Sequence, residues 1–252
     1  MRGKRATERV GVRLATATLA TCALAMTAVF GSTGAVAASG PPTASGSPTA
    51  KPTRAPTAKP APVRKGAGGK VVYLTFDDGP HPVYTPQILW LLEKYDAKAT
   101  FFMVGSAAKT NPKVAREVRR SPHSIGNHTY SHPWLTKVTS AEVRRQLRAT
   151  DALLGQTRCM RPPGGFVNST VRKAVAAEGK SLVMWNVDTR DWARPGAAAI
   201  ARTAIDEAGP GRTILMHDGG GDRSQTVRAL AQVLRTLRAD GYRFETLPAC
   251  RR

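Results

Sequence analysis

The stretch of sequence that decides the fold spans residues 71–80 and reads VVYLTFDDGP. Its first six residues are apolar or favour β-structure, which predicts a short buried strand over residues 71–76. Asp77 and Asp78 follow this strand directly, and the Gly-Pro pair after them predicts a turn. Adjacent aspartates before a turn often serve only to form it, so their meaning depends on which other residues the fold brings to the end of this strand.

Downstream of this strand, short apolar runs alternate with segments that have the periodicity of helices. Thr139 and Glu142 form a capping-box sequence, which predicts a helix that extends to about Leu154. Such alternation implies parallel strands joined by right-handed crossovers, and it fits either a doubly wound sheet or a small (β/α) barrel. Further strands are predicted at residues 99–104, 123–126, 158–161, 181–187, 212–217 and 242–247, and further helices at 84–95, 112–120, 168–178, 196–208 and 224–239.

Five polar clusters end or follow the predicted strands. In both candidate folds, ligands bind beyond the carboxyl ends of the strands. Each cluster alone has an ordinary structural explanation, such as a turn, a surface arginine or a buried histidine, but their joint placement predicts the rim of an active site. The clusters are Asp77-Asp78, His128 to His132, Arg161 to Gly165, Asp188 to Trp192, and His217-Asp218.

The same clusters contain the parts of a metal-dependent hydrolase. The His-x-x-x-His spacing places His128 and His132 on one face of an expected helix, which is a common arrangement of metal ligands. Together with Asp78 they form a set of two histidines and one carboxylate, which leaves coordination positions open for water and substrate. Asp77 is then available as a base, and His217 as an acid from another strand.

These motifs resemble the five ordered motifs of the NodB-homology polysaccharide deacetylases, carbohydrate esterase family 4. The resemblance covers residues 71–248 and implies a distorted seven-stranded (β/α) barrel. It also implies an enzyme that removes acetyl groups from N-acetylated sugars. The matching segments are residues 75–80, 128–132, 161–163, 188–192 and 215–217.

The resemblance assigns the metal ligands and the groups that transfer protons. Asp78, His128 and His132 are expected to bind a divalent metal, most often zinc and in some members cobalt or nickel. Asp77 is expected to act as the general base, and His217 is expected to protonate the leaving amine.

The resemblance also assigns supporting roles. Arg161 is expected to hold the base, and Asp191 to orient the acid. Trp192 and Leu215 are expected to line the pocket for the acetyl methyl group, and the backbone N–H of Gly164 to bind the oxyanion. Many family members carry an aromatic residue at the position of Gly164, so this chain lacks that side-chain wall.

The first 37 residues have the features of an export signal. Five arginines and lysines precede residue 14, residues 14–30 carry no charge, and residues 35–37 form an Ala-x-Ala cleavage site. The alternative is an uncleaved anchor over residues 14–30, since this run is nearly long enough to span a membrane. We therefore expect an exported protein that is extracellular, associated with the cell wall or anchored to the membrane.

Residues 38–70 form a basic linker that is rich in proline, alanine and threonine. Such a segment cannot bury enough apolar surface to offset the entropy of ordering it, so we expect it to be disordered. The chain carries a net charge of +21, and the positive linker suits an anionic cell-wall or membrane surface, with a merely solvated spacer as the alternative. Nucleic acid is not an expected partner, because the chain is exported and only 6% of its residues are aromatic.

The three cysteines are too few for a scaffold built on disulfides. Cleavage of the signal would leave Cys159 and Cys250, and two cysteines in an oxidising compartment predict one disulfide bond. Cys250 lies just past the last predicted strand, so the bond requires the chain to turn back after Pro248. The family resemblance requires neither cysteine, and two unpaired thiols are the alternative.

The sequence therefore predicts that residues 71–252 form the catalytic domain of a monomeric, metal-dependent N-deacetylase. Its expected substrates are cell-wall or chitin-like polymers that contain N-acetylglucosamine. The alternatives are an acetylxylan O-deacetylase of the same family and a non-catalytic wall-binding protein. The mean hydropathy of −0.28 excludes a polytopic membrane protein. The glycines at residues 219–221 either border the sugar-binding site or form a flexible loop.

Overall fold

The structure is a computed structural model, and it describes residues 70–251. The signal or anchor expected at residues 1–37 lies outside the described residues, as does all but the last residue of the linker expected at 38–70. Within residues 70–251, no helix has both the length and the apolar character that a membrane crossing requires.

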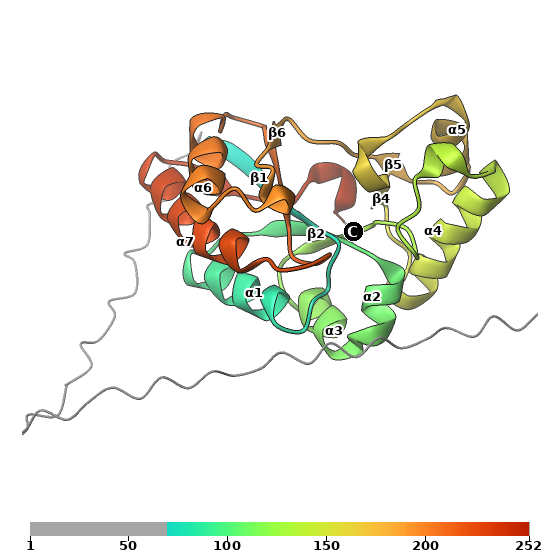
Figure 1. Cartoon of the computed structure of the whole chain (residues 1–252), viewed down its shortest axis with the longest axis horizontal. Helices are drawn as coiled ribbons and strands as arrows, with labels where there is room; N and C mark the ends of the chain where they lie inside the picture. The colour runs from blue at the N-terminus through green and yellow to red at the C-terminus, as the bar shows by residue number, and fades with distance from the viewer. Residues whose placement is uncertain (1–69, 252) are drawn as a thin grey trace, which may run out of the picture. The chain divides into compact units, whose positions relative to one another are not determined.

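Strand β1 (Val71–Asp77) is the central strand of a parallel sheet (Figure 1). It pairs with β2 (Ala99–Met103) on one side and β7 (Thr213–His217) on the other, and the short β8 (Arg243–Phe244) pairs with its first residues. The order along the sheet is β5-β4-β3-β2-β1-β7-β6, which confirms the expected distorted α/β barrel with seven strands along its path. The remaining strands are β3 (Ser124–Asn127), β4 (Cys159–Met160), β5 (Ser181–Leu182) and β6 (Val187–Asp188).

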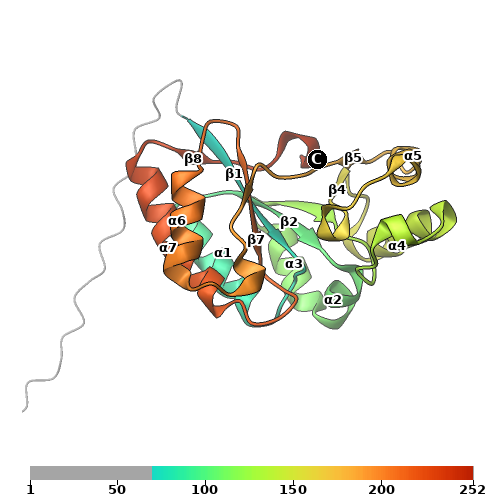
Figure 2. The ribbon, with the colours of Figure 1, turned by 45° about the horizontal axis from the view of Figure 1, so that its top comes forward.

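Seven helices connect these strands within the described residues. The Thr139 hydroxyl accepts a hydrogen bond from the backbone N–H of Glu142 at 3.2 Å, so the capping box starts α4 as its sequence predicts. Figure 2 shows α6 and α7 together on one side of β1, with α4 and α5 together at the opposite end of the molecule. The helices are α1 (Tyr84–Lys94), α2 (Gly105–Thr110), α3 (Pro112–Arg120), α4 (Ser140–Leu154), α5 (Ser169–Ala177), α6 (Ala197–Asp206) and α7 (Ser224–Ala239).

The core lies between the central strands and the helices that cover them. Val72, Leu74 and Phe76 on β1 are fully buried, and every residue of β2 is buried. A parallel strand that is covered on both faces needs a nearly continuous apolar run, which explains why residues 71–76 lack the alternation of a half-exposed strand. Buried side chains of α1 and α7 complete this core, among them Ile88, Leu92, Leu230, Val233 and Leu234.

The single strand predicted at residues 181–187 is wrong, because the structure divides this segment between two strands. β5 pairs with β4 at one end of the sheet order, whereas β6 pairs with β7 at the other end. Residues 183–186 connect the two edges. The backbone N–H of Val183 donates to the carbonyl of Met160, and that of Asn186 donates to the carbonyl of Thr213. An apolar run alone does not show that its two ends pair with different neighbours, so the break was not visible in the sequence.

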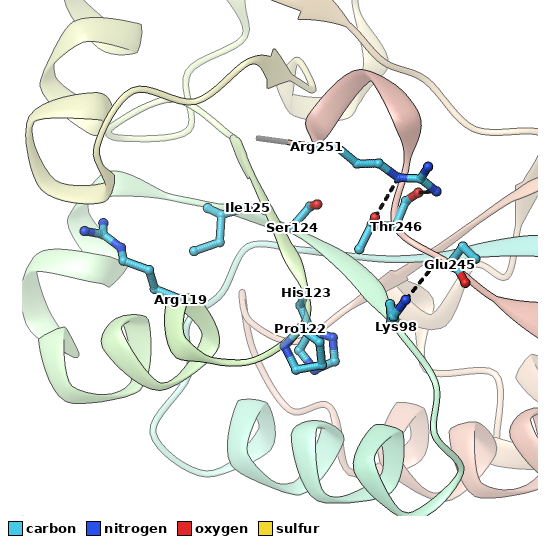
Figure 3. Close-up of a pocket in the computed structure, with 9 residues that line it drawn as sticks. All are labelled: Lys98, Arg119, Pro122, His123, Ser124, Ile125, Glu245, Thr246 and Arg251. Carbon is cyan, nitrogen blue, oxygen red and sulfur yellow. Dashed lines mark hydrogen bonds and ion pairs between the residues drawn. The ribbon is translucent and has the colours of Figure 1, made fainter.

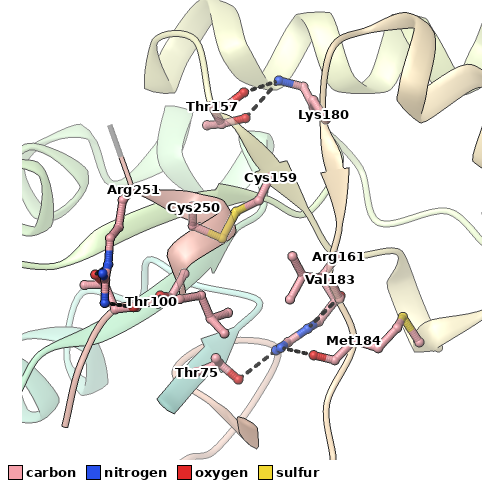
Figure 4. The surroundings of a disulfide bond; sticks show 12 residues. Thr75, Thr100, Thr157, Cys159, Arg161, Lys180, Val183, Met184, Cys250 and Arg251 are labelled. Atoms are coloured by element: carbon pink, nitrogen blue, oxygen red, sulfur yellow. Dashed lines mark hydrogen bonds between the residues drawn. A yellow bond between two sulfur atoms is a disulfide. The ribbon is translucent and has the colours of Figure 1, made fainter. Parts of the chain in front are cut away.

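The last predicted strand, at residues 242–247, is also shorter than expected. After β8 the chain leaves the sheet and ends in a 3₁₀ turn over Pro248–Cys250. This turn carries Cys250 back to Cys159 at the start of β4, and the two residues form a disulfide with a Cα–Cα distance of 5.0 Å (Figure 4). The bond is buried together with Phe102 and Leu247, and it ties the C-terminal end of the described chain to the sheet.

Loss of the disulfide is expected to lower thermal stability strongly. The bond closes a chain segment of 91 residues, for which the chain-entropy estimate is up to about 4–5 kcal/mol. Cys250→Ser should therefore lower the melting temperature by roughly 10–15 °C, measured by circular dichroism. Dithiothreitol should produce the same shift in the wild-type protein and no shift in Cys250→Ser. Equal melting temperatures for the wild type and Cys250→Ser, both measured without dithiothreitol, would contradict this prediction.

Candidate active site

The carboxyl ends of the strands bring the five polar clusters to one rim of the barrel. The register pairs Asp77 at the end of β1 directly with His217 at the end of β7. His128 directly follows β3, and Arg161 directly follows β4. Because parallel strands all point in one direction, these side chains gather at the same end of the sheet.

Asp78, His128 and His132 converge on one point of this rim. Oδ1 of Asp78 lies 3.4 Å from Nε2 of His128 and 3.1 Å from Nε2 of His132. Each of the three residues offers a ligand atom, and these atoms lie within 4.8 Å of one another. The structure therefore brings together the three ligands that the sequence predicts.

The donor atoms at this point fit a divalent cation. Oδ1 of Asp78 is buried without a hydrogen-bond partner, which is costly unless an ion or another donor satisfies it. The Nδ1–H of His128 donates to the carbonyl of Arg161 at 2.7 Å, because a carbonyl can only accept. This bond leaves the lone pair on Nε2 of His128 directed at the shared point, as a metal ligand requires.

The same contacts favour a charged carboxylate at this point. Burial alone would raise the pKa of Asp78, but the adjacent imidazoles of His128 and His132 outweigh burial and hold that pKa well below its ordinary value. The nearby Asp78 carboxylate raises the pKa of His132 in turn, against the opposing effect of burial. Asp78 is therefore an anionic ligand.

The expectation that His128 and His132 share a helix face is wrong. Residues 128–132 form a loop after β3, in which Thr129 and His132 have positive φ angles of 67° and 58°. A side chain on α4 shapes this loop, because Oε1 of Gln146 accepts the backbone N–H groups of Tyr130 and Ser131, both at 2.9 Å. The sequence analysis missed Gln146, because nothing in the motif refers to a helix that comes later in the chain.

Arg161 is completely buried and holds Asp77 in place. Its Nη1 donates to Oδ1 of Asp77 and to the hydroxyl of Thr75, both at 2.8 Å. Its Nη2 donates to the carbonyl of Met184 at 3.1 Å (Figure 4), and the guanidinium lies 4.2 Å from the ring centre of Phe102. One side chain therefore joins β1, the end of β4 and the segment that connects the two edges of the sheet.

Asp191 orients His217 through two hydrogen bonds and is itself held by a third, from Thr226. Its Oδ1 accepts the Nδ1–H of His217 at 2.7 Å, and its Oδ2 accepts the backbone N–H of His217 and the hydroxyl of Thr226 at 2.8 and 2.7 Å. Burial opposes protonation of His217, but the bond to Asp191 and the charges of Asp191, Asp77 and Asp78 outweigh it and raise the pKa of His217. The sequence analysis missed Thr226, which lies on the first turn of α7 without a motif of its own.

The glycine-rich segment after His217 packs directly against Asp78. A Cβ atom at Gly219 would collide with the backbone of Asp78, and one at Gly220 would lie 2.5 Å from Oδ2 of Asp78. The segment therefore closes around a candidate metal ligand. Beside it, the buried carboxyl of Asp218 accepts the Thr85 hydroxyl at 2.5 Å and leaves no room for a side chain at Gly79.

The three expected substrate-binding residues differ in exposure. Leu215 is buried, whereas Trp192 is 50% exposed, and the guanidinium of Arg190 lies 5.5 Å from the Trp192 ring centre. Gly164 adopts a positive φ of 64° in the turn after Arg161, which is a conformation that favours glycine. Gly164 and Trp192 lie in the segments that follow β4 and β6, whereas Leu215 lies within β7.

A cavity of about 500 Å³ lies at the opposite end of the barrel from this rim. Its lining includes Lys98, His123 and Arg251, which precede strands or follow β8, so it faces the amino-terminal ends of the central strands (Figure 3). Lys98 pairs with Glu245 at 3.2 Å, Arg251 donates to Thr246, and burial lowers the pKa of His123 to about 4. Because its cations already have partners within the chain, this cavity is not the candidate active site.

Comparisons with known proteins agree with this arrangement. A sequence model of the polysaccharide deacetylase family matches residues 64–183. The chain is 41% identical to a peptidoglycan-N-acetylglucosamine deacetylase of Bacillus cereus over 71% of this chain and 86% of that protein. It is 38% identical to a chitooligosaccharide deacetylase of Sinorhizobium fredii over 73% of this chain and 94% of that protein. It also resembles the structure of a family 4 carbohydrate esterase from Streptomyces lividans in complex with acetate, with a TM-score of 0.68 and 31% identity over 73% of this chain and 95% of the other.

Removal of Arg161 is expected to destabilise the fold by leaving a buried charge without a partner. Arg161→Met should lower the free energy of unfolding by about 3–5 kcal/mol, measured by urea denaturation. The double variant Arg161→Met/Asp77→Leu should recover part of this loss, because it removes both charges. Arg145→Ala, which breaks an exposed pair with Glu142, is the matched control and should change stability little. A loss no larger for Arg161→Met than for Arg145→Ala would contradict the prediction.

Removal of the Asp191 charge is expected to lower the pKa of His217. In Asp191→Asn, burial remains while the attraction that outweighs it is lost, so His217 should titrate at lower pH in an NMR experiment. The pKa of His217 is higher in the fold than in the unfolded chain. The His217–Asp191 pair therefore stabilises the fold fully at pH values below the ordinary imidazole pKa. This stabilisation is lost as the pH rises through the raised pKa of His217. His123, at the far end of the barrel, is the internal control and should not shift. An unchanged pKa of His217 would show that Asp191 does not set it.

Proposed function

The chain belongs to the polysaccharide deacetylases of NodB homology, carbohydrate esterase family 4, and from this membership we propose that it removes acetyl groups from N-acetylglucosamine units of a cell-wall glycan. The relatives named as peptidoglycan-N-acetylglucosamine and chitooligosaccharide deacetylases are hydrolases that cleave the acetyl amide bond of acetylated sugars. The observation that carries the proposal is the single rim on which Asp78, His128 and His132 face a base and an acid held by separate partners.

The two oxygens of Asp77 have different surroundings, which suits this residue to act as the base. Oδ1 accepts from Arg161, whereas Oδ2 lies 3.8 Å from Nε2 of His128 and so faces the metal ligands. A divalent metal held by Asp78, His128 and His132 would polarise the acetyl carbonyl and lower the pKa of water there. Oδ2 of Asp77 can then take a proton from the water that attacks this carbonyl.

His217 can supply the proton that the leaving group needs. Its Nδ1–H is engaged by Asp191, so Nε2 is the nitrogen that donates to the amine. As the C–N bond breaks, the sugar nitrogen takes this proton and leaves as a free amine, and the acetyl carbon leaves as acetate. The raised pKa of His217 favours the protonated form that an acid needs.

Zinc is the metal that this ligand set suits best. Two imidazole nitrogens and one carboxylate oxygen are ordinary zinc ligands, and a catalytic zinc site keeps a position open beyond three protein ligands. Cobalt and nickel accept the same donors, so a comparison of metals belongs in the activity assay.

Two substrates are supported by named relatives. The Bacillus cereus relative is named for peptidoglycan and the Sinorhizobium fredii relative for chitooligosaccharides, and both share the N-acetylglucosamine unit. We place peptidoglycan first, because an exported chain with a basic linker over residues 38–70 would meet an anionic cell wall. The export signal over residues 1–37 supports an extracellular or wall-associated location.

Acetate release tests the proposed activity. Purified protein loaded with zinc should release acetate from peptidoglycan or chitopentaose and much less from acetylxylan, which separates an N-deacetylase from an O-deacetylase. Chelation with EDTA should abolish release and zinc should restore it. His128→Ala should lose both the bound metal and the activity, because a ligand is removed.

His123→Ala is the matched control, since this histidine lies at the opposite end of the barrel, and it should retain metal and activity. Full activity in chelated protein would rule out the metal-dependent mechanism. Acetate release from none of the glycans would favour the non-catalytic wall-binding alternative.

A further inference from the structure

Two exposed aromatic rings stand together on the catalytic rim. Trp134 and Phe166 are 56% and 48% exposed, although tryptophan and phenylalanine side chains are usually buried in a folded domain. Their ring centres lie 5.3 Å apart with an interplanar angle of 59°. They come from different loops, the one after β3 and the one after β4, so their contact is made by the tertiary structure and not by the local sequence.

The pair lies beside the reacting centre. Trp134 is only two residues beyond the metal ligand His132, so their Cα atoms are at most about 7 Å apart. Phe166 follows the turn that begins at Arg161, the residue that holds the catalytic base. A contiguous apolar patch exposed at such a place usually marks a binding surface.

Gly164 leaves the space that Phe166 occupies. A Cβ atom at Gly164 would lie 2.7 and 2.9 Å from two carbons of the Phe166 ring, which is closer than atoms that are not bonded can approach. The Phe166 ring therefore packs where a side chain at residue 164 would begin. The structure therefore places an aromatic ring beside residue 164.

The chemistry of an aromatic pair matches one face of a sugar ring. A β-linked pyranose carries its hydroxyl groups around the edge and C–H groups on its faces, and these C–H groups are apolar and slightly positive. The face of an aromatic ring is apolar and slightly negative, so the two surfaces attract each other and exclude water. Neither Trp134 nor Phe166 has a cation against its ring among the cation–ring contacts of the described residues, and about half of each side chain is exposed to solvent.

We propose that Trp134 and Phe166 form a stacking platform for the sugar ring that adjoins the N-acetylglucosamine being deacetylated. The inference rests on the proposed function, and it adds that the enzyme selects oligomers or polymers over the single sugar. A monomer would fill the reacting centre and leave the platform empty, and it would therefore lose the binding energy of the second ring.

Binding of a sugar that cannot be turned over tests the platform directly. The probe is the fully deacetylated pentamer of glucosamine, and its Kd is measured by isothermal titration calorimetry with the zinc-loaded protein. Trp134→Ala and Phe166→Ala should each raise Kd about tenfold, and Trp134→Phe should stay close to wild type because it keeps a ring. Trp90→Ala is the matched control, since Trp90 is 59% exposed on α1 and is not in the rim loops, and its Kd should not change.

Turnover gives a second, independent measure. The ratio of acetate release from chitopentaose to that from N-acetylglucosamine should fall about tenfold in Trp134→Ala. Equal Kd values for wild type and Trp134→Ala, or no binding of the pentamer by the wild type, would overturn the platform. If Kd depends on Trp134 while the wild type deacetylates none of the glycans, the proposed function fails and the platform stands.

Discussion

The buried ion pair between Arg161 and Asp77 is the interaction on which the catalytic end of this molecule depends. A guanidinium with no solvent exposure needs hydrogen-bond partners, and each nitrogen of Arg161 finds one on β1 or on the segment at Val183 and Met184. The residue also contributes its own carbonyl, which accepts the Nδ1–H of His128. One side chain and its backbone thus set the position of the base, of one metal ligand and of the chain that connects the two edges of the sheet.

The rim consists of two halves that are held separately. On one half, a turn and a loop place Asp78 and the two histidines. Gln146 accepts a hydrogen bond from the loop, and the glycines after His217 pack against Asp78. On the other half, Asp191 fixes both the ring and the backbone of His217. The base and the acid therefore have different electrostatic surroundings, which is the condition for opposite proton-transfer roles at one pH.

The groups of the candidate site and the interactions that stabilise the fold lie in different parts of the barrel. The carboxyl ends of the strands carry charged groups, positive φ angles and exposed aromatic rings, all of which reduce stability when considered alone. The apolar core around β1 and β2 and the disulfide between Cys159 and Cys250 supply stability away from these groups. In the loop after β4, the Phe166 ring occupies the space beside Gly164.

The sequence by itself determined the strand at residues 71–76, the parallel α/β order and the clusters at strand ends, because strand and helix periodicities and polar residues that follow apolar runs are local signals. It also indicated the ligands Asp78, His128 and His132, since their residue types and their positions after predicted strands carry that information. Only the tertiary structure decided that residues 181–187 divide between two edges of the sheet, that His128 and His132 lie on a loop, and that Trp134 meets Phe166. Each of these depends on contacts between segments far apart in the chain, whose geometry has no counterpart in local spacing.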